Sequence, residues 1–121
     1  MKLVGKVVKG QGFATLAFGL PTANLEVEEY IDLEPGAYVG IASVNKTKYD
    51  AVMYAGVVGS DKFEVHLFDF SGDLYGQQLE VEILELISAH VPWVSEQQMK
   101  AKVAADVALA KDYFATRSSS V

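Results

Sequence analysis

The chain has 121 residues, half of them hydrophobic, with a formal net charge of −6 and no cysteine. This length suits one domain with its own core. The absence of cysteine excludes disulfides and thiolate metal sites and favours a reducing, cytoplasmic location. The acidic balance argues against a nucleic-acid partner, because basic side chains that neutralise phosphates supply most of the affinity in such complexes. No apolar run approaches the roughly 20 residues of a membrane span, and no signal-peptide pattern is visible at the start, so we expect no membrane contact.

The first segment, residues 2–8, predicts a short strand in which Gly5 marks a close approach of another backbone. Gly10-Gln11-Gly12 follows it. These two glycines are typical of a phosphate-binding loop, but no Lys-Ser/Thr pair comes after them. On its own, this loop is a weak signal.

A bend with potential oxygen ligands comes next, in the stretch Pro21-Thr22-Ala23-Asn24. Proline fixes its own φ near −65° and favours an extended residue before it. If the backbone beyond it is extended, Thr22 and Asn24 present their side-chain oxygens in the same direction. Such hard oxygen ligands suit Mg²⁺. Read alone, the stretch is more typical of a capped turn.

Four further strands are predicted by alternating or β-branched patterns. An acidic segment, residues 27–34, first ends at the turn signal Pro35-Gly36. The next two strands form a hairpin around Asn45-Lys46-Thr47. The predicted ranges are 37–44, 48–58, 62–70 and 79–86.

One helix is clear. Ser95 is a good N-cap with Gln98 three residues later, which is a capping box. An apolar stripe then recurs at helical spacing, at Met99, Val103, Val107, Ala110 and Phe114. Several short strands followed by one helix favour a mainly β protein, a closed antiparallel barrel with the C-terminal helix packed on it. We expect residues 1–116 to form this domain and residues 117–121 to be a frayed tail.

Glu64 is the most pointed candidate for catalysis, because it shares a strand face with His66 and has Phe68 and Phe70 beyond it. A carboxylate among aromatic rings can serve as a general base or orient a hydroxyl nucleophile. A solvated strand face is the simpler alternative.

The remaining candidates are weaker. Asp73-Leu74-Tyr75-Gly76 is either an ordinary turn or the tip of a loop over a site. Trp93, just before the helix, is more typical of packing between helix and barrel than of a platform for a flat ring. The two histidines, His66 and His90, lack ligand spacing, which disfavours a zinc site.

Taken in order, these pieces resemble the riboflavin kinase family, which also supplies the kinase module of bifunctional bacterial FAD synthetases. The resemblance covers roughly residues 4–114. It rests on Gly5-Lys6-Val7-Val8-Lys9-Gly10-Gln11-Gly12, Gly19-Leu20-Pro21-Thr22-Ala23-Asn24-Leu25, Pro35-Gly36-Ala37-Tyr38-Val39-Gly40, Phe63-Glu64-Val65-His66, Asp69-Phe70, Asp73-Leu74-Tyr75-Gly76, and Asp106 with Lys111.

The resemblance implies a six-stranded antiparallel Greek-key barrel with a terminal helix, which transfers the γ-phosphate of ATP to the riboflavin 5′-hydroxyl to give FMN. We expect the chain to act as a monomer. It implies that Thr22 and Asn24 engage Mg²⁺ and the nucleotide phosphates. It further implies that the loop at Gly10 and Gly12 wraps the nucleotide, that Glu64 is the base, and that Trp93 borders the flavin.

Two departures from the family pattern keep other readings open. Phe13-Ala14 stands where the family usually has Arg-Gly, and Ser88 where an arginine is common. Loss of charge-assisted contacts near a phosphate weakens transition-state stabilisation. The alternative is therefore a catalytically weak or inactive flavin- or nucleotide-binding barrel with a regulatory role. A third reading is a module of a longer FAD synthetase.

Overall fold

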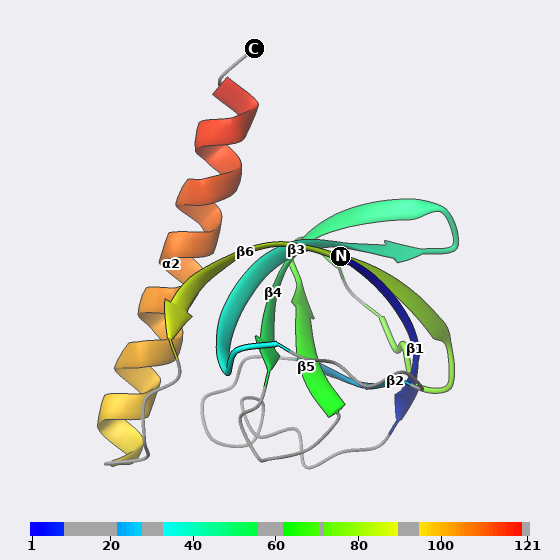
Figure 1. Ribbon diagram of the computed structural model, residues 1–121, viewed down its shortest axis with the longest axis horizontal. Coiled ribbons are helices and arrows are strands. Elements are labelled where there is room, and N and C mark those ends of the chain that lie inside the picture. Colours follow the sequence, from blue (N-terminus) through cyan, green and yellow to red (C-terminus); the bar gives the residue numbers. More distant parts are fainter. Residues whose placement is uncertain (9–21, 28–32, 56–61, 71, 90–94, 120–121) are drawn as a thin grey trace.

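The structure, a computed structural model, describes residues 1–8, 22–27, 33–55, 62–70, 72–89 and 95–119. A closed antiparallel barrel carries one long helix on its outside (Figure 1). This confirms the predicted fold class. The elements are β1 (Lys2–Val8), β2 (Ala23–Val27), β3 (Gly36–Val44), β4 (Thr47–Ala55), β5 (Lys62–Leu67), β6 (Gln78–Ala89) and α2 (Glu96–Ser119).

The strands close in the order β1-β2-β5-β4-β3-β6, and every pair is antiparallel. Strands β3, β4 and β5 follow one another as hairpin neighbours, while β2 lies beside β5 rather than β3. This arrangement is a Greek key. Each of the described strands has a partner strand on both sides, although β4 pairs with β5 only from Ala51 onward.

The β3–β4 hairpin forms as the sequence predicts. Asn45 and Lys46 both have positive φ, 48° and 72°. Two such residues form the two-residue hairpin turn that matches the twist of the flanking strands. The predicted end of the second hairpin strand, beyond Ala55, lies outside the described residues.

Strand β2 was not predicted from the sequence, because Pro21 and the short polar residues after it are typical of a turn. Leu25 and Val27 point into the barrel and are buried, while Glu26 is exposed. That alternation is the signal that identifies the strand. The extended backbone on which the Thr22 and Asn24 hypothesis depended is therefore present.

Strand β5 is shorter than predicted. It ends at Leu67 instead of continuing to Phe70, and a turn follows at Phe68 and Asp69. Asp69 has a φ of 60°, and this left-handed conformation breaks the strand. The predicted alternation within the strand holds, since Val65 and Leu67 lie in the barrel core and Glu64 and His66 on the other face.

The barrel interior is filled by apolar side chains that alternate along the strands, including Leu25, Met53, Val65, Leu79 and Val81. A second cluster lies on the outer surface of the barrel under α2, where Ala37, Val39, Val52 and Tyr54 meet Ala110. The barrel thus buries both faces of β3 and β4, and the helix completes the fold on that side.

Helix α2 begins at the predicted cap, where the backbone N–H of Gln98 donates to Ser95 Oγ at 3.2 Å. Its packed face follows the predicted stripe, with Val107 and Phe114 against the second cluster and Ala110 fully buried. The helix continues to Ser119, into the segment expected to fray. Its C-terminal end extends past the barrel (Figure 1). Within the described part of the chain, this helix is not apolar enough to span a membrane.

Candidate active site

A single row of paired residues runs across five strands and carries the candidate site. The register pairs Asn24 with Glu64, Glu64 with Tyr54, Tyr54 with Ala37, and Ala37 with Ser88. Directly paired residues in neighbouring strands project from the same face. Since Leu25 and Val65 next to them point inward, the row lies on the outer surface of the barrel. Polar groups from distant parts of the sequence thereby become neighbours.

Thr22 and Glu64 are in direct contact at one end of this row. The Thr22 hydroxyl donates to Glu64 Oε1 at 2.8 Å, across 42 residues of sequence. Glu64 is only 9% exposed. Asn24 lies on strand β2, Thr22 directly precedes that strand, and Glu64 lies on β5. The structure therefore brings these three residues together, and their roles stay predictions.

Tyr54 lies next to Glu64 in the row and was not singled out from the sequence. Its side chain is buried under α2, and its hydroxyl makes no hydrogen bond with any described residue. Burial, reinforced by the negative charges of Asp106 and Glu64, raises the pKa of Tyr54 well above that of an exposed tyrosine. The hydroxyl therefore keeps its proton at neutral pH and remains a donor.

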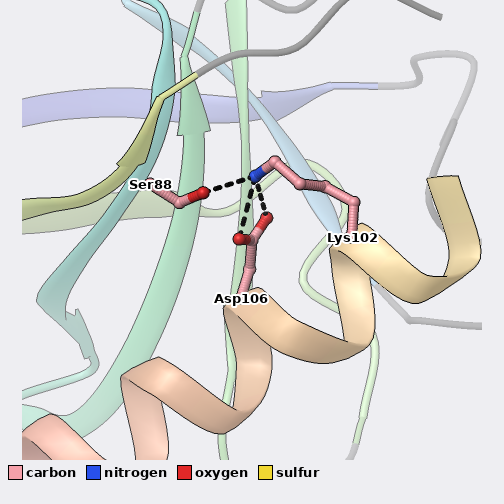
Figure 2. A network of polar contacts seen from close by, with 3 residues as sticks. All are labelled: Ser88, Lys102 and Asp106. Atoms are coloured by element: carbon pink, nitrogen blue, oxygen red, sulfur yellow. Dashed lines mark hydrogen bonds and ion pairs between the residues drawn. The ribbon is translucent and has the colours of Figure 1, made fainter. Parts of the chain in front are cut away.

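A buried ion pair from the helix occupies the other end of the row (Figure 2). Lys102 Nζ donates to both carboxylate oxygens of Asp106, at 2.9 and 2.8 Å, and to Ser88 Oγ at 2.6 Å. Asp106 is 2% exposed, so it needs this partner. Ser88 is the position where the family pattern led us to expect an arginine. Here a lysine one helical turn before Asp106 supplies the cation instead.

A pocket of about 310 Å³ opens beside Thr22 and Asn24. Its volume is at the low end of small-molecule sites. Three ring side chains, His66, Phe70 and Tyr75, stand in its wall and could hold a flat ring. The other lining residues are Val7, Val8, Ala23, Val65, Leu67, Gly72, Asp73 and Leu74.

The segment Asp73 to Gly76 forms a turn at the rim of this pocket. The Tyr75 backbone N–H donates to Asp73 Oδ1 at 2.9 Å, which is an Asx turn. Leu74 is buried in the barrel core, and the Gly76 N–H donates to the Val7 carbonyl at 2.9 Å. The segment is thus a turn, and it lies against the candidate site.

The oxygen atoms of Thr22 and Asn24 suit Mg²⁺ better than a metal, such as zinc, that is held by three or four protein side chains. The described residues contain no group of three or more His, Cys, Asp or Glu side chains suited to hold a metal. Thr22 and Asn24, which carry one hydroxyl and one amide oxygen, both line the same pocket. Mg²⁺ that is held mainly by substrate phosphates and water needs only one or two ligands from the protein.

Three of the residues predicted for the site fall outside the described part of the chain. They are Gly10 and Gly12 of the glycine loop, and Trp93 before the helix. Tyr54 and Lys102 are the site residues that sequence reasoning missed. A single tyrosine in an apolar strand, such as Tyr54, is typical of a core residue. The i, i+4 spacing of Lys102 and Asp106 on the helix was the sequence signal that indicated their ion pair.

Comparison with protein families gives a clear match. The family model described as "Flavokinase: Riboflavin kinase" matches residues 1–114.

Several curated proteins resemble the chain over most of its length. A bifunctional riboflavin kinase/FMN adenylyltransferase of Haemophilus influenzae is 29% identical over 123 residues, covering 93% of this chain and 38% of the relative. The protein of the same name from Mycoplasma pneumoniae is 31% identical, covering 92% and 42%. The RNA-binding riboflavin kinase RibR of Bacillus subtilis is 33% identical, covering 87% and 47%. The chain thus spans less than half the length of these relatives.

A solved structure shares the fold. It is described as a macrolide-efflux protein from Streptococcus pneumoniae, with a TM-score of 0.80 and 28% identity, and the match covers 91% of this chain and 38% of that one. The high TM-score supports the barrel-and-helix architecture.

Proposed function

This chain belongs to the riboflavin kinase family, and we propose that it transfers the γ-phosphate of ATP to the 5′-hydroxyl of riboflavin, giving FMN and ADP. The observation that carries the proposal is the 2.8 Å hydrogen bond from Thr22 to Glu64. It joins Thr22, which lines the pocket, to the buried carboxylate of Glu64 on the next strand. Phosphoryl transfer requires that a nucleotide site and a catalytic base lie close together.

We assign the pocket beside Thr22 and Asn24 to the nucleotide. The ring side chains of His66, Phe70 and Tyr75 suit a flat base, and the two oxygen-bearing residues suit a metal–phosphate group. The Thr22 hydroxyl has lone pairs for a cation while its proton is donated to Glu64. When bound, Mg²⁺ would neutralise charge on the transferred phosphoryl group.

We assign Glu64 the role of general base. Its carboxylate would accept the proton of the riboflavin 5′-hydroxyl as that oxygen bonds to the γ-phosphorus. The bond from that phosphorus to the bridging oxygen of ADP breaks at the same time, and ADP carries away the electron pair. The contact with Thr22 holds the carboxylate in place, and burial keeps water from competing for it.

The direct test is to incubate the protein with riboflavin, ATP and Mg²⁺ and to follow FMN by chromatography. We expect FMN with the unchanged chain. Glu64→Gln keeps the size of the side chain and removes its basicity, so we expect FMN formation to fall by about 10²–10⁴-fold. Riboflavin binding, followed by flavin fluorescence, should persist in this variant.

The same experiment separates the kinase from the alternative of a binding barrel. A chain that binds flavin but forms no FMN would contradict the kinase proposal and favour the binding barrel. FMN formation that survives Glu64→Gln would remove Glu64 from the role of base and leave the kinase proposal standing.

Thr22→Val tests the nucleotide side of the site. Valine keeps the shape of the side chain and removes the hydroxyl that touches Glu64 and faces the pocket. We expect a lower rate and a greater Mg²⁺ requirement, measured by titrating Mg²⁺ at fixed ATP. An unchanged Mg²⁺ dependence would show that Thr22 serves Glu64 alone.

A further inference from the structure

The Tyr54 hydroxyl is a buried donor that the fold leaves without a partner among the described residues. An unsatisfied buried polar group destabilises the folded state. Phenylalanine would fill the same space without that cost. The hydroxyl therefore calls for an explanation other than packing.

Two carboxylates, those of Asp106 and Glu64, act on this hydroxyl electrostatically. Asp106 is already engaged, because Lys102 Nζ donates to each of its oxygens. The described hydrogen bond of Glu64 involves one oxygen, Oε1. A carboxylate has about four acceptor positions. Glu64 is thus the acceptor with remaining capacity.

The backbone register brings Tyr54 and Glu64 together. They are directly paired across β4 and β5 on the outer face of the barrel. Paired positions of this kind have Cβ atoms about 4.5–5.5 Å apart. The Tyr54 ring is packed in the cluster under α2 with Ala110, so the helix restricts the direction of the hydroxyl.

We propose that Tyr54 is a positioning residue for Glu64: its hydroxyl donates to the Glu64 carboxylate in the substrate-bound protein and, with Thr22, sets the direction in which that carboxylate faces the acceptor alcohol. This inference rests on the proposed kinase function. It accounts for a buried hydroxyl that no described residue satisfies, because catalytic hydrogen bonds often tighten only once substrate is bound. Lys102 contributes by occupying Asp106, the competing acceptor.

Tyr54→Phe tests the inference, because it removes only the hydroxyl. We expect kcat for FMN formation to fall on the order of ten-fold or more, since misplacing a reacting group carries a large rate penalty. The KM for ATP and the riboflavin affinity measured by fluorescence should stay within about two-fold, because Tyr54 acts through Glu64. The melting temperature should be equal to or higher than that of the unchanged protein, because an unsatisfied donor is removed.

Tyr113→Phe is the matched control. Tyr113 packs against the same cluster, but its hydroxyl accepts a hydrogen bond from Arg117 near the far end of the helix. It should leave kcat unchanged. A second check adds Tyr54→Phe to Glu64→Gln, where we expect no further loss of the residual rate.

Three outcomes would overturn the inference. The first is a kcat for Tyr54→Phe within two-fold of the control, which would reduce Tyr54 to a packing residue while the kinase function stands. The second is a loss of riboflavin binding in that variant, which would make Tyr54 a direct substrate contact. The third is a further loss in the double variant. If the unchanged chain forms no FMN at all, the proposed function itself fails, and this inference fails with it.

Discussion

At the scale of single residues, the candidate site combines two acids in contrasting surroundings. Glu64 accepts a hydrogen bond from the neutral hydroxyl of Thr22, whereas Asp106 is fully paired with the cation of Lys102. Tyr54 stands between them as a neutral donor. Because Asp106 is compensated by its lysine, Glu64 is the carboxylate left to accept a proton. This division supports the different roles that we propose for the two acids.

Tyr54 also predicts how stability depends on pH. Its pKa is raised in the folded protein, by burial first and by Asp106 and Glu64 next. Below the unfolded pKa of about 10 both states are protonated and nothing is lost. Above it, the unfolded chain releases the proton while the folded protein retains it, so stability falls by up to about 1.4 kcal/mol per pH unit from this group.

The measurement is urea unfolding between pH 9 and 11.5, compared for the unchanged protein and Tyr54→Phe. We expect the variant to lose less stability at the alkaline end, because its phenyl ring cannot ionise. Tyr113→Phe again serves as the control and should follow the unchanged protein. Parallel alkaline profiles for all three proteins would contradict a buried, protonated Tyr54.

At the scale of elements, the docking of α2 decides the geometry of the row. The helix contacts β3, β4 and β6. It covers Tyr54 with the turn that carries Asp106 and Ala110, and reaches Ser88 through Lys102. Most of this interface is apolar packing, and Lys102, which pairs with Asp106, adds a directional hydrogen bond to Ser88. The helix thereby fixes the side chains of Tyr54 and Ser88 in the row that also contains Glu64.

Removing Lys102 should loosen this contact. Lys102→Met leaves the buried Asp106 carboxylate without its cation, which we expect to reduce the free energy of unfolding by about 3–5 kcal/mol. Adding Asp106→Leu to it should recover most of the loss, because replacing both members of a buried pair by apolar residues is often neutral.

Lys100→Met is the control for this series. Lys100 is exposed on the same helix, and its replacement should change the free energy of unfolding by less than about 0.5 kcal/mol. Denaturant unfolding followed by circular dichroism measures all four proteins. A single Lys102→Met variant as stable as the Lys100→Met control would show that the ion pair contributes nothing to docking.

At the scale of the whole molecule, backbones of neighbouring barrel strands approach closely at Gly5 and at Gly40. A Cβ at Gly5 would lie 2.6 Å from the Glu26 carbonyl oxygen. At Gly40, a Cβ would meet the Glu82 carbonyl oxygen and, at 2.6 Å, the Met53 methyl group. The closest obstacle in each case is backbone, which cannot rotate away. Closure in turn brings β2, from the first quarter of the chain, beside β5.

Gly40→Ala should therefore destabilise the barrel, by about 1–3 kcal/mol as for other overpacked positions. Shortening the neighbour with Met53→Ala in the same chain should not restore stability, because the clash with the Glu82 carbonyl remains and a cavity is added. Thermal unfolding measures both variants. Recovery in the double variant would show that Met53, and not the backbone, sets the limit at Gly40.

The sequence by itself determined the local structure and the kinds of group available. The Asn45-Lys46 turn, the Ser95 cap and the alternation around Glu64 each depend on residues a few positions apart, so they could be predicted. The succession of short strands and one helix predicted a closed antiparallel barrel, and the resemblance to riboflavin kinases added its six strands, its Greek-key order and the grouping of Thr22, Asn24 and Glu64. Both rest on information present along the chain.

Which groups face one another depends on the three-dimensional packing of the chain. The pairing of Tyr54 with Glu64 depends on the register of β4 against β5, and the contact of Lys102 with Ser88 depends on how the helix docks. A shift of one residue in either strand would turn the paired side chain to the opposite face of the barrel. Register and docking are fixed by the packing of the entire barrel, so no local pattern could reveal that Tyr54 lies beside the proposed base.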